Sequence, residues 1–189
     1  MADKKTSNPW RTLSSEEVYR DPWVRLRKDQ VIRPDGSPGT YTVVGVGNNA
    51  AIIALSPQQE VYLVGEYLYP LQTYSWQVPS GAVPPEEAPL AAARRELEEE
   101  IGLIAGEWQE LGAFYMSGGI STQTSYVFLA KGLQQTTAHP EPTERLAVKK
   151  VPLETARQMC YQGEIKDAPS IVGILWAANY LNSAKQDGS

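Results

Sequence analysis

Apolar and polar residues alternate along residues 16–47, on both sides of the turn-like segment "PDGSPG" at 34–39. Such alternation is typical of strands with one covered face, and Pro, Asp and Gly favour a chain reversal. Residues 16–47 are therefore predicted to form a β-hairpin. Its arms contain few continuous apolar stretches, so we expect it to pack against the main body of the chain or against a second copy.

From residue 49 the pattern changes to continuous apolar runs, "NAAIIALSP" and "EVYLVGEYLYP", which predict two buried strands. Further strands are predicted at "GEWQELGAFYMS", "TSYVFLAKGL" and "LAVKKVPL", and helices at 84–102, 153–163 and 167–182. Strands, one central helix, more strands and two final helices indicate the α/β class in its broad sense, here with the segregated order called α+β. We expect a mixed β-sheet sandwiched between helices.

A length of 189 residues with 42% hydrophobic residues allows one domain with a substantial core and a small appended element. The expected division is an N-terminal tail and hairpin at 1–47, a main domain at 48–183 and a flexible tail at 184–189. No run reaches the roughly 18 apolar residues of a membrane span, and the polar start lacks the core of a signal peptide. The protein is therefore expected to be cytoplasmic, without a membrane partner.

The net charge of -5, without a basic run, argues against a binding surface for DNA or RNA. The chain has one cysteine, Cys160, expected to be a small core residue, and one histidine, His139, in a polar loop. This composition excludes a zinc cluster of His and Cys. A metal site would need carboxylates, which select hard ions such as magnesium or manganese.

The helix at 84–102 belongs to the segment "GAVPPEEAPLAAARRELEEEIGL", which contains six glutamates. The prolines at 84–85 are expected to set its start, the glutamates at 86–87 to suit its positive N-terminal end, and Gly102 to close it. At about 100° per residue, an apolar face lies beside an acidic flank. The apolar face consists of Leu90, Ala93, Leu97 and Ile101, and the acidic flank of Glu96, Glu99 and Glu100.

Three like charges at this spacing repel one another by a few tenths of a kcal/mol per pair, about 0.2–0.5 in an isolated helix. One interpretation is a solvated face, on which Arg94 and Arg95 pair with Glu98 and Glu99. The other is a metal site, in which a bound cation offsets the repulsion. The spacing of the whole segment favours the metal site.

Seven fixed positions and two aliphatic ones match every position of the Nudix box. The fixed positions are Gly81, Glu87, Arg95, Glu96, Glu99, Glu100 and Gly102, and the aliphatic ones are Leu97 and Leu103. The fixed set would coincide by chance on the order of once in a hundred million starts. The segment therefore resembles the Nudix hydrolases, which cleave nucleoside diphosphates linked to another group. The resemblance implies the Nudix fold and hydrolysis that depends on Mg²⁺ or Mn²⁺.

The resemblance also implies a role for each residue of the box. The implied metal ligands are Glu96, Glu99, Glu100 and the backbone carbonyl of Ser80. The implied structural residues are Gly81, Glu87, Arg95 and Gly102. Of these, Arg95 and Glu87 would form an ion pair that fixes the loop against the helix, and the two glycines would permit the loop and the helix exit.

Beyond the box, "YLVGEYLYPLQTYSWQVPSGA" and "GEIKDAPSIVGILWAANYL" resemble the ADP-ribose pyrophosphatase and nucleoside-diphosphate-sugar hydrolase branch of the family. That branch implies a homodimer that exchanges the N-terminal hairpin, with the substrate between the Nudix core and the partner. It also implies a catalytic base in the loop "HPEPTERLAV". Glu144 and Glu141 are the candidates in this loop, and Glu99 of the box is the alternative.

The substrate is expected to be ADP-ribose or a nucleotide sugar, cleaved to a nucleoside monophosphate and a sugar phosphate. The choice stays open because Leu68 stands where relatives that prefer ADP-ribose often carry an arginine. Expected substrate contacts are Tyr67, Trp76, Trp23 and Arg27, with core or dimer packing as the alternative for the aromatic residues. Two other functions are hydrolysis of dinucleoside polyphosphates or noncanonical nucleotides, and sensing of nucleotide sugars without cleavage.

Overall fold

The computed structural model describes residues 7–140 and 145–187, with side chains up to residue 183. The chain forms two compact units. The first consists of Met1–Gly47 and Tyr115–Gln123, and the second of Asn48–Phe114 and Thr124–Ser189.

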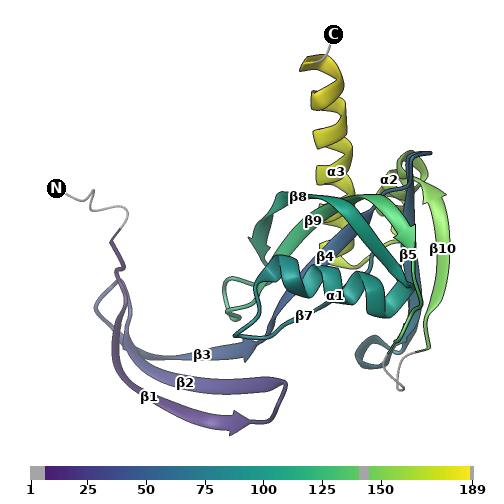
Figure 1. The fold of residues 1–189 in the computed structure, drawn as a ribbon. Helices are drawn as coiled ribbons and strands as arrows, with labels where there is room; N and C mark the ends of the chain where they lie inside the picture. Colours follow the sequence, from purple (N-terminus) through teal and green to yellow (C-terminus); the bar gives the residue numbers. More distant parts are fainter. Residues whose placement is uncertain (1–6, 141–144, 188–189) are drawn as a thin grey trace. The chain divides into compact units, whose positions relative to one another are not determined.

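The first unit contains a three-stranded antiparallel sheet in the order β1-β2-β3 (Figure 1). Its strands are β1 (Arg11–Arg20), β2 (Val24–Ile32) and β3 (Pro38–Val46). The predicted reversal at 34–39 joins β2 to β3 and is confirmed. Gly36 has the left-handed φ of 84° that favours glycine in such turns.

Strand β1 precedes the predicted reversal and was not recognised as a separate strand from the sequence. All its residues are exposed, and its apolar residues Leu13, Val18 and Tyr19 do not follow the two-residue period that would mark a separate strand. Asp21 turns the chain between β1 and β2, because its Oδ1 accepts hydrogen bonds from the backbone N–H groups of Trp23 at 2.8 Å and Val24 at 2.6 Å.

The second unit contains two sheets in the part of the chain that is described. One has the order β7-β4-β9-β8, with β4 (Asn48–Ala54), β7 (Ser80–Val83), β8 (Leu103–Tyr115) and β9 (Thr124–Gln135). The other has the order β10-β5-β6, with β5 (Glu60–Leu68), β6 (Thr73–Gln77) and β10 (Ala147–Pro152). A short 3-10 helix, η1 (Tyr69–Leu71), joins β5 to β6. Because β4 runs parallel to β9 and antiparallel to β7, the first of these sheets is mixed, as predicted.

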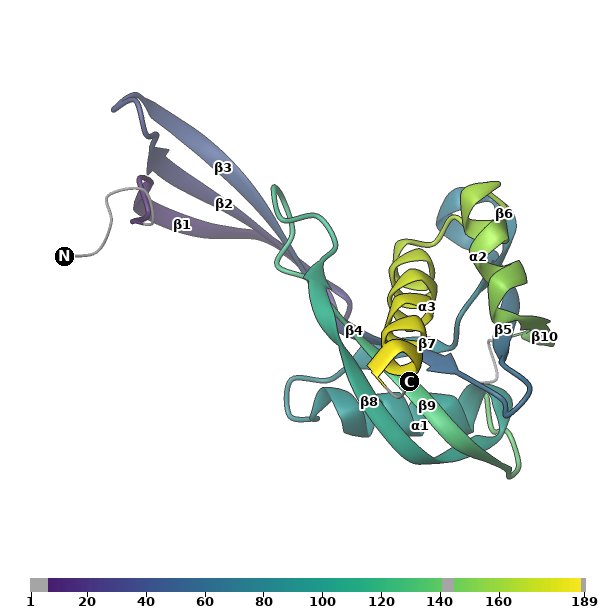
Figure 2. The ribbon, with the colours of Figure 1, turned by 90° about the horizontal axis from the view of Figure 1, so that it is seen from above.

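Helices cover both faces of the β7-β4-β9-β8 sheet (Figure 2). They are α1 (Pro89–Ile101), α2 (Leu153–Tyr161) and α3 (Ala168–Asp187). Successive residues of a strand point to opposite faces of its sheet. Ala50 and Ile52 of β4 accordingly pack in one cluster with Leu97 of α1, whereas Ile53 packs in another with Ile174 of α3. The predicted arrangement of a sheet between helices is confirmed.

Helix α1 starts later than predicted and ends as predicted. It begins at Pro89, not at the prolines at 84–85, and Ala88 before it is extended. A residue before proline avoids the helical region, whereas proline itself suits the first helical position. The glutamates at 86–87 therefore lie before the helix and not in its first turn, which corrects the sequence prediction. At the other end Gly102 has a φ of 62° and closes the helix.

Helices α2 and α3 complete the core on the other face of the sheet. Cys160 of α2 is half-buried against this core, as expected for a small apolar residue, and burial raises the pKa of its thiol. Ile174 and Ala177 of α3 are fully buried. Among the described helices, including the apolar α3, none has the length and hydropathy needed to cross a membrane.

Candidate active site

The box residues come together where the edge strand β7 passes α1. The backbone N–H of Ser80 donates a hydrogen bond of 3.1 Å to Oε2 of Glu100. A Cβ added at Gly81 would collide with the carboxyl group of Glu96, so a residue without a side chain lets that carboxylate lie against the strand. Two segments that are distant in the sequence thus form one acidic site.

The backbone carbonyl of Ser80 points away from the sheet interior. Ser80 lies opposite Ala51 of β4, and the adjacent Pro79 carbonyl accepts the ladder hydrogen bond from Ile52 at 2.8 Å. Ser80 is therefore at a position that exchanges no hydrogen bonds with β4, and its N–H and C=O both point outward. The carbonyl is directed to the side on which the N–H meets Glu100.

Arg95 is the cation within the acidic flank. Its guanidinium lies 3.1 Å from Glu87, 2.7 Å from Glu96 and 2.9 Å from Glu99. It also donates to the carbonyl of Ala82 at 3.0 Å. These contacts, with the Glu87 hydrogen bond as the largest, raise the pKa of Arg95. The ion pair with Glu87 joins the turn before α1 to the helix, in the pairing that the Nudix resemblance implies.

The alternative interpretation, a solvated helix face on which Arg94 and Arg95 pair with Glu98 and Glu99, is met only in part. Arg95 pairs with Glu99 as that interpretation requires, but Arg94 lies over the ring of Trp108, 5.9 Å from its centroid. The side chain of Glu96 is only 14% exposed. A carboxylate enclosed in this way needs charge compensation that water alone supplies poorly.

The oxygen donors of the site fit a hard divalent cation. Glu96, Glu99, Glu100 and an outward backbone carbonyl offer the ligand atoms that Mg²⁺ and Mn²⁺ prefer. Within the described residues, no group of three His, Cys, Asp or Glu side chains is arranged as a complete ligand set. Arg95 holds two of these carboxylates in the structure.

The loop after β9 packs on the C-terminal end of α1. The N–H of Thr136 donates to the carbonyl of Gly102 at 2.8 Å, and the N–H of His139 donates to the carbonyl of Glu99 at 2.9 Å. The His139 side chain is exposed, as expected. The candidate bases Glu141 and Glu144 lie outside the described residues, but the loop that leads to them begins beside the acidic flank.

Two of the four expected substrate residues lie in the β10-β5-β6 sheet of the same unit. Tyr67 of β5 is exposed, and its hydroxyl donates to the side-chain oxygen of Gln72 at 3.2 Å. Trp76 of β6 is packed against the core, with Lys149 Nζ 3.9 Å from the centroid of its ring and the ring of Tyr74 edge-on to it. Tyr67 therefore has a ring open to a ligand, whereas Lys149 covers one face of Trp76.

The other two expected substrate residues belong to the first unit. Trp23, in the turn between β1 and β2, is 76% exposed. Arg27 of β2 forms an ion pair of 3.0 Å with Asp29, a buried carboxylate. Trp23 is thus available to a ligand or a partner chain, and Arg27 is partly engaged within its own sheet.

Comparison with known families decides the identity of this fold and box. A family model described as "NUDIX domain" matches residues 46–171, more than half of the chain. The chain belongs to the Nudix family. A second model, "Nucleoside diphosphate sugar hydrolase N-terminal domain", matches residues 10–44, which include β1, β2 and most of β3 of the first unit.

Relatives cover most of this Nudix chain. It is 32% identical over 168 residues to the "ADP-ribose pyrophosphatase" of Mycobacterium tuberculosis (strain ATCC 25618 / H37Rv), covering 87% of this chain and 81% of that protein. It is 27% identical over 166 residues to the "ADP-ribose pyrophosphatase" of Bacillus subtilis (strain 168), covering 87% and 90%. A solved structure, "Crystal structure of ADP compounds hydrolase", matches with a TM-score of 0.82 at 19% identity, over 93% of this chain and 95% of that one, which supports the Nudix fold.

Sequence reasoning missed one link to the Nudix box. Ser170 of α3 accepts a hydrogen bond of 2.9 Å from the backbone N–H of Val78, two residues before Ser80. The available signal was local, because Asp167 followed three residues later by Ser170 is a pattern for a helix start. The contact with Val78 is distant in the sequence and could not be read from that pattern.

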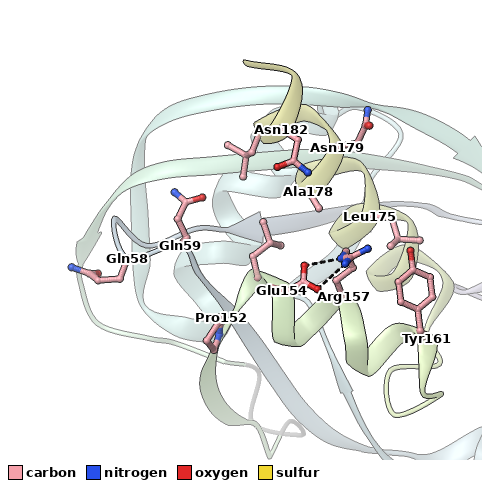
Figure 3. Close-up of a pocket in the computed structure, with 12 residues that line it drawn as sticks. Gln58, Gln59, Pro152, Glu154, Arg157, Tyr161, Leu175, Ala178, Asn179 and Asn182 are labelled. Carbon is pink, nitrogen blue, oxygen red and sulfur yellow. Dashed lines mark hydrogen bonds and ion pairs between the residues drawn. The ribbon is translucent and has the colours of Figure 1, made fainter. Parts of the chain in front are cut away.

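Two cavities in the described part of the Nudix domain lie apart from the box. One of about 590 Å³ lies between α2, α3 and the turn that precedes β5, and the Glu154–Arg157 ion pair forms part of its wall (Figure 3). Its lining includes Leu153 and Ala178, which pack on the face of the sheet opposite α1. Neither this cavity nor a second one of about 470 Å³ beside Leu68 is lined by a residue of the box.

Proposed function

We propose that this Nudix protein is a divalent-metal-dependent pyrophosphatase that acts on a nucleoside diphosphate linked to a sugar. ADP-ribose or a nucleotide sugar would be cleaved to a nucleoside monophosphate and a sugar phosphate. The observation that carries the proposal is the contact of Glu96 and Glu100 with residues 80–81, beside the Arg95 network. The substrate class is supported by the relatives described as ADP-ribose pyrophosphatases.

In this proposal the metal ligands are Glu96, Glu99, Glu100 and the Ser80 carbonyl, and the ion is Mg²⁺ or Mn²⁺. When bound, the ion would neutralise charge on the diphosphate and polarise the attacking water. Arg95 would keep the turn before α1 in place through Glu87, a contact separate from the metal ligands. Gly81 and Gly102 would provide the close approach to Glu96 and the helix exit.

A base must also take a proton from the attacking water. Glu144 and Glu141 are proposed for this role because the described part of their loop is anchored to the end of α1. If either supplies the base, its change to Gln should lower kcat by about 100-fold or more. Both variants keeping kcat within about threefold of wild type, well under 1 kcal/mol, would assign the role to Glu99.

Substrate binding is proposed to use Tyr67, Trp76, Trp23 and Arg27. The exposed rings of Tyr67 and Trp23 support stacking of a base or sugar, and the contact of Trp76 with Lys149 limits it to its other face. Trp23 and Arg27 belong to the N-terminal element at 1–47. We also propose that this element forms a homodimer, and that the substrate sites are completed in this dimer.

The direct test offers the purified protein a panel of ADP-ribose, nucleotide sugars, dinucleoside polyphosphates and nucleoside triphosphates, with Mg²⁺ and separately with Mn²⁺. Products are resolved by chromatography, and Glu100→Gln serves as the control. The expected result is one diphosphate–sugar class cleaved far faster than the rest, with activity lost in the control. Faster cleavage of dinucleoside polyphosphates would assign the protein to that substrate class instead. Tight binding of a nucleotide sugar without cleavage would indicate a sensor.

A further inference from the structure

Ser170, in the first turn of α3, is completely buried and connects two segments of the second unit. Its Oγ lies 2.6 Å from Oδ2 of Asp167 and 2.9 Å from the backbone N of Val78. An ionised carboxylate can only accept, so the Ser170 hydroxyl donates its proton to Asp167. Its lone pairs are therefore left to accept the hydrogen bond from Val78.

The backbone that follows Val78 is held at each successive residue. Pro79 has a fixed φ and no N–H, and its carbonyl accepts a hydrogen bond of 2.8 Å from β4. The N–H of Ser80 donates to Glu100 at 3.1 Å. The segment 78–80 is thus fixed by α3 through Ser170, by β4 and by α1.

We propose that Ser170 is a positioning residue for the metal site, because through Val78 it fixes the direction of the Ser80 carbonyl. Asp167 keeps the Ser170 hydroxyl in its accepting orientation. The inference rests on the proposed function, in which that carbonyl is a metal ligand. Partners that orient ligands in this way commonly change metal affinity or activity by about 10–100-fold when they are removed.

The hydroxyl of Ser170 can be separated from the cap of α3. Asp167 Oδ2 also accepts a hydrogen bond of 2.9 Å from the backbone N–H of Ser170, the bond that an N-cap residue makes. Ser170→Ala keeps this backbone bond and removes the link to Val78. The variant therefore tests the position of residues 78–80 without deleting the helix cap.

The experiment measures Mn²⁺ binding to the full chain by electron paramagnetic resonance, together with kcat and KM for the best diphosphate substrate. Ser170→Ala should weaken Mn²⁺ binding about tenfold or more and lower kcat, with KM for the diphosphate within about twofold. Ser170→Thr keeps the hydroxyl and should restore Mn²⁺ affinity. Ile174→Val, which removes one methyl group from the buried side of the same helix, is the control for general loosening and should bind Mn²⁺ like the wild type.

If Ser170→Ala bound Mn²⁺ as tightly as the wild type, the inference about Ser170 would be overturned and the proposed function would stand. An equal loss in Ile174→Val would also overturn the inference, because the effect would then be general destabilisation. A wild-type protein that binds no Mn²⁺, or whose binding is unchanged by Glu100→Gln, would instead overturn the proposed function, and the role of Ser170 with it.

Discussion

Arg95 and Gly81 together allow three glutamates to share one flank of α1. Arg95 offsets their mutual repulsion and ties Glu96 and Glu99 to the turn before the helix. Gly81 leaves the space that the Glu96 carboxylate occupies. These two residues act on charge and on volume, so their substitutions should have different consequences.

Gly81→Ala is expected to fold but to lose activity. The added Cβ would meet the carboxyl end of a flexible side chain, which can move aside, and so Glu96 would be displaced from the proposed metal site. The melting temperature should change little, whereas kcat for the diphosphate should fall about tenfold or more. Thermal unfolding and steady-state kinetics measure the two effects. Gly106→Ala is the control, because its added Cβ would lie 3.7 Å from the nearest atom, and full activity in Gly81→Ala would contradict the prediction.

The residue spacing of the box was enough to predict that three glutamates share one flank of α1. Helical geometry places Glu96, Glu99 and Glu100 on one flank, and the left-handed φ of Gly102 was predicted from its place at the helix end. The contact between Ser170 and Val78 could not be predicted, because it depends on how α3 packs against the sheet.

At the scale of elements, sequence patterns located the strands β4, β5, β8, β9 and β10 but neither strand β1 nor the start of α1. The apolar runs of β4, β5 and β9 gave clear signals because both faces of these strands are largely covered. Strand β1 gave none, because its few apolar residues do not recur at every second position. The start of α1 was placed too early because two proline positions, 84–85 and Pro89, compete for the same role, and the conformation of Ala88 decides between them.

Helix α2 is predicted to lose stability in acid through a single ion pair. Arg157 makes hydrogen bonds of 2.8 and 2.7 Å to Glu154 and lowers the pKa of that carboxyl from 4.5 to about 2. Because the folded pKa is depressed, the stabilisation is complete above pH 4.5 and is lost as the pH falls through about 2. The pair is solvent-exposed, so the effect should be modest.

Thermal unfolding of wild type and Glu154→Gln at a series of pH values tests this prediction. The variant should melt below the wild type at pH 6, and the two melting temperatures should converge as the pH falls from 4.5 towards 2. If the difference in melting temperature between the two proteins stayed constant over the whole pH series, the ion pair would not be its cause.

At the scale of the whole molecule, the two units differ in how well they bury their apolar residues. The second unit has two apolar clusters covered by helices. Among its described residues the first buries only one apolar side chain, Val31, and it exposes several large ones, among them Leu13 at 55%, Tyr19 at 54% and Trp23 at 76%. Exposed apolar residues gathered in one element commonly mark an interaction site. This distribution supports the proposed role of residues 1–47 in a homodimer.

Sedimentation at micromolar concentration is predicted to give twice the chain mass of 20.8 kDa. Leu13→Asp places a charge among the exposed apolar residues and should shift the mass towards a single chain. Ser14→Asp, at the neighbouring exposed polar position, is the comparison for added charge and should leave the dimer largely intact. A wild-type mass of one chain would contradict the dimer.

The central claim is that the acidic flank of α1, together with residues 80–81, holds a metal ion that is needed for hydrolysis. The most direct measurement is the rate of nucleoside monophosphate release from the best substrate while Mg²⁺ or Mn²⁺ is raised from zero, in wild type and in Glu100→Gln. The rate should be absent without metal, rise to saturation in the wild type, and stay about tenfold or more lower in the variant. Release of nucleoside monophosphate that is independent of metal, or equal in the two proteins, would contradict this claim.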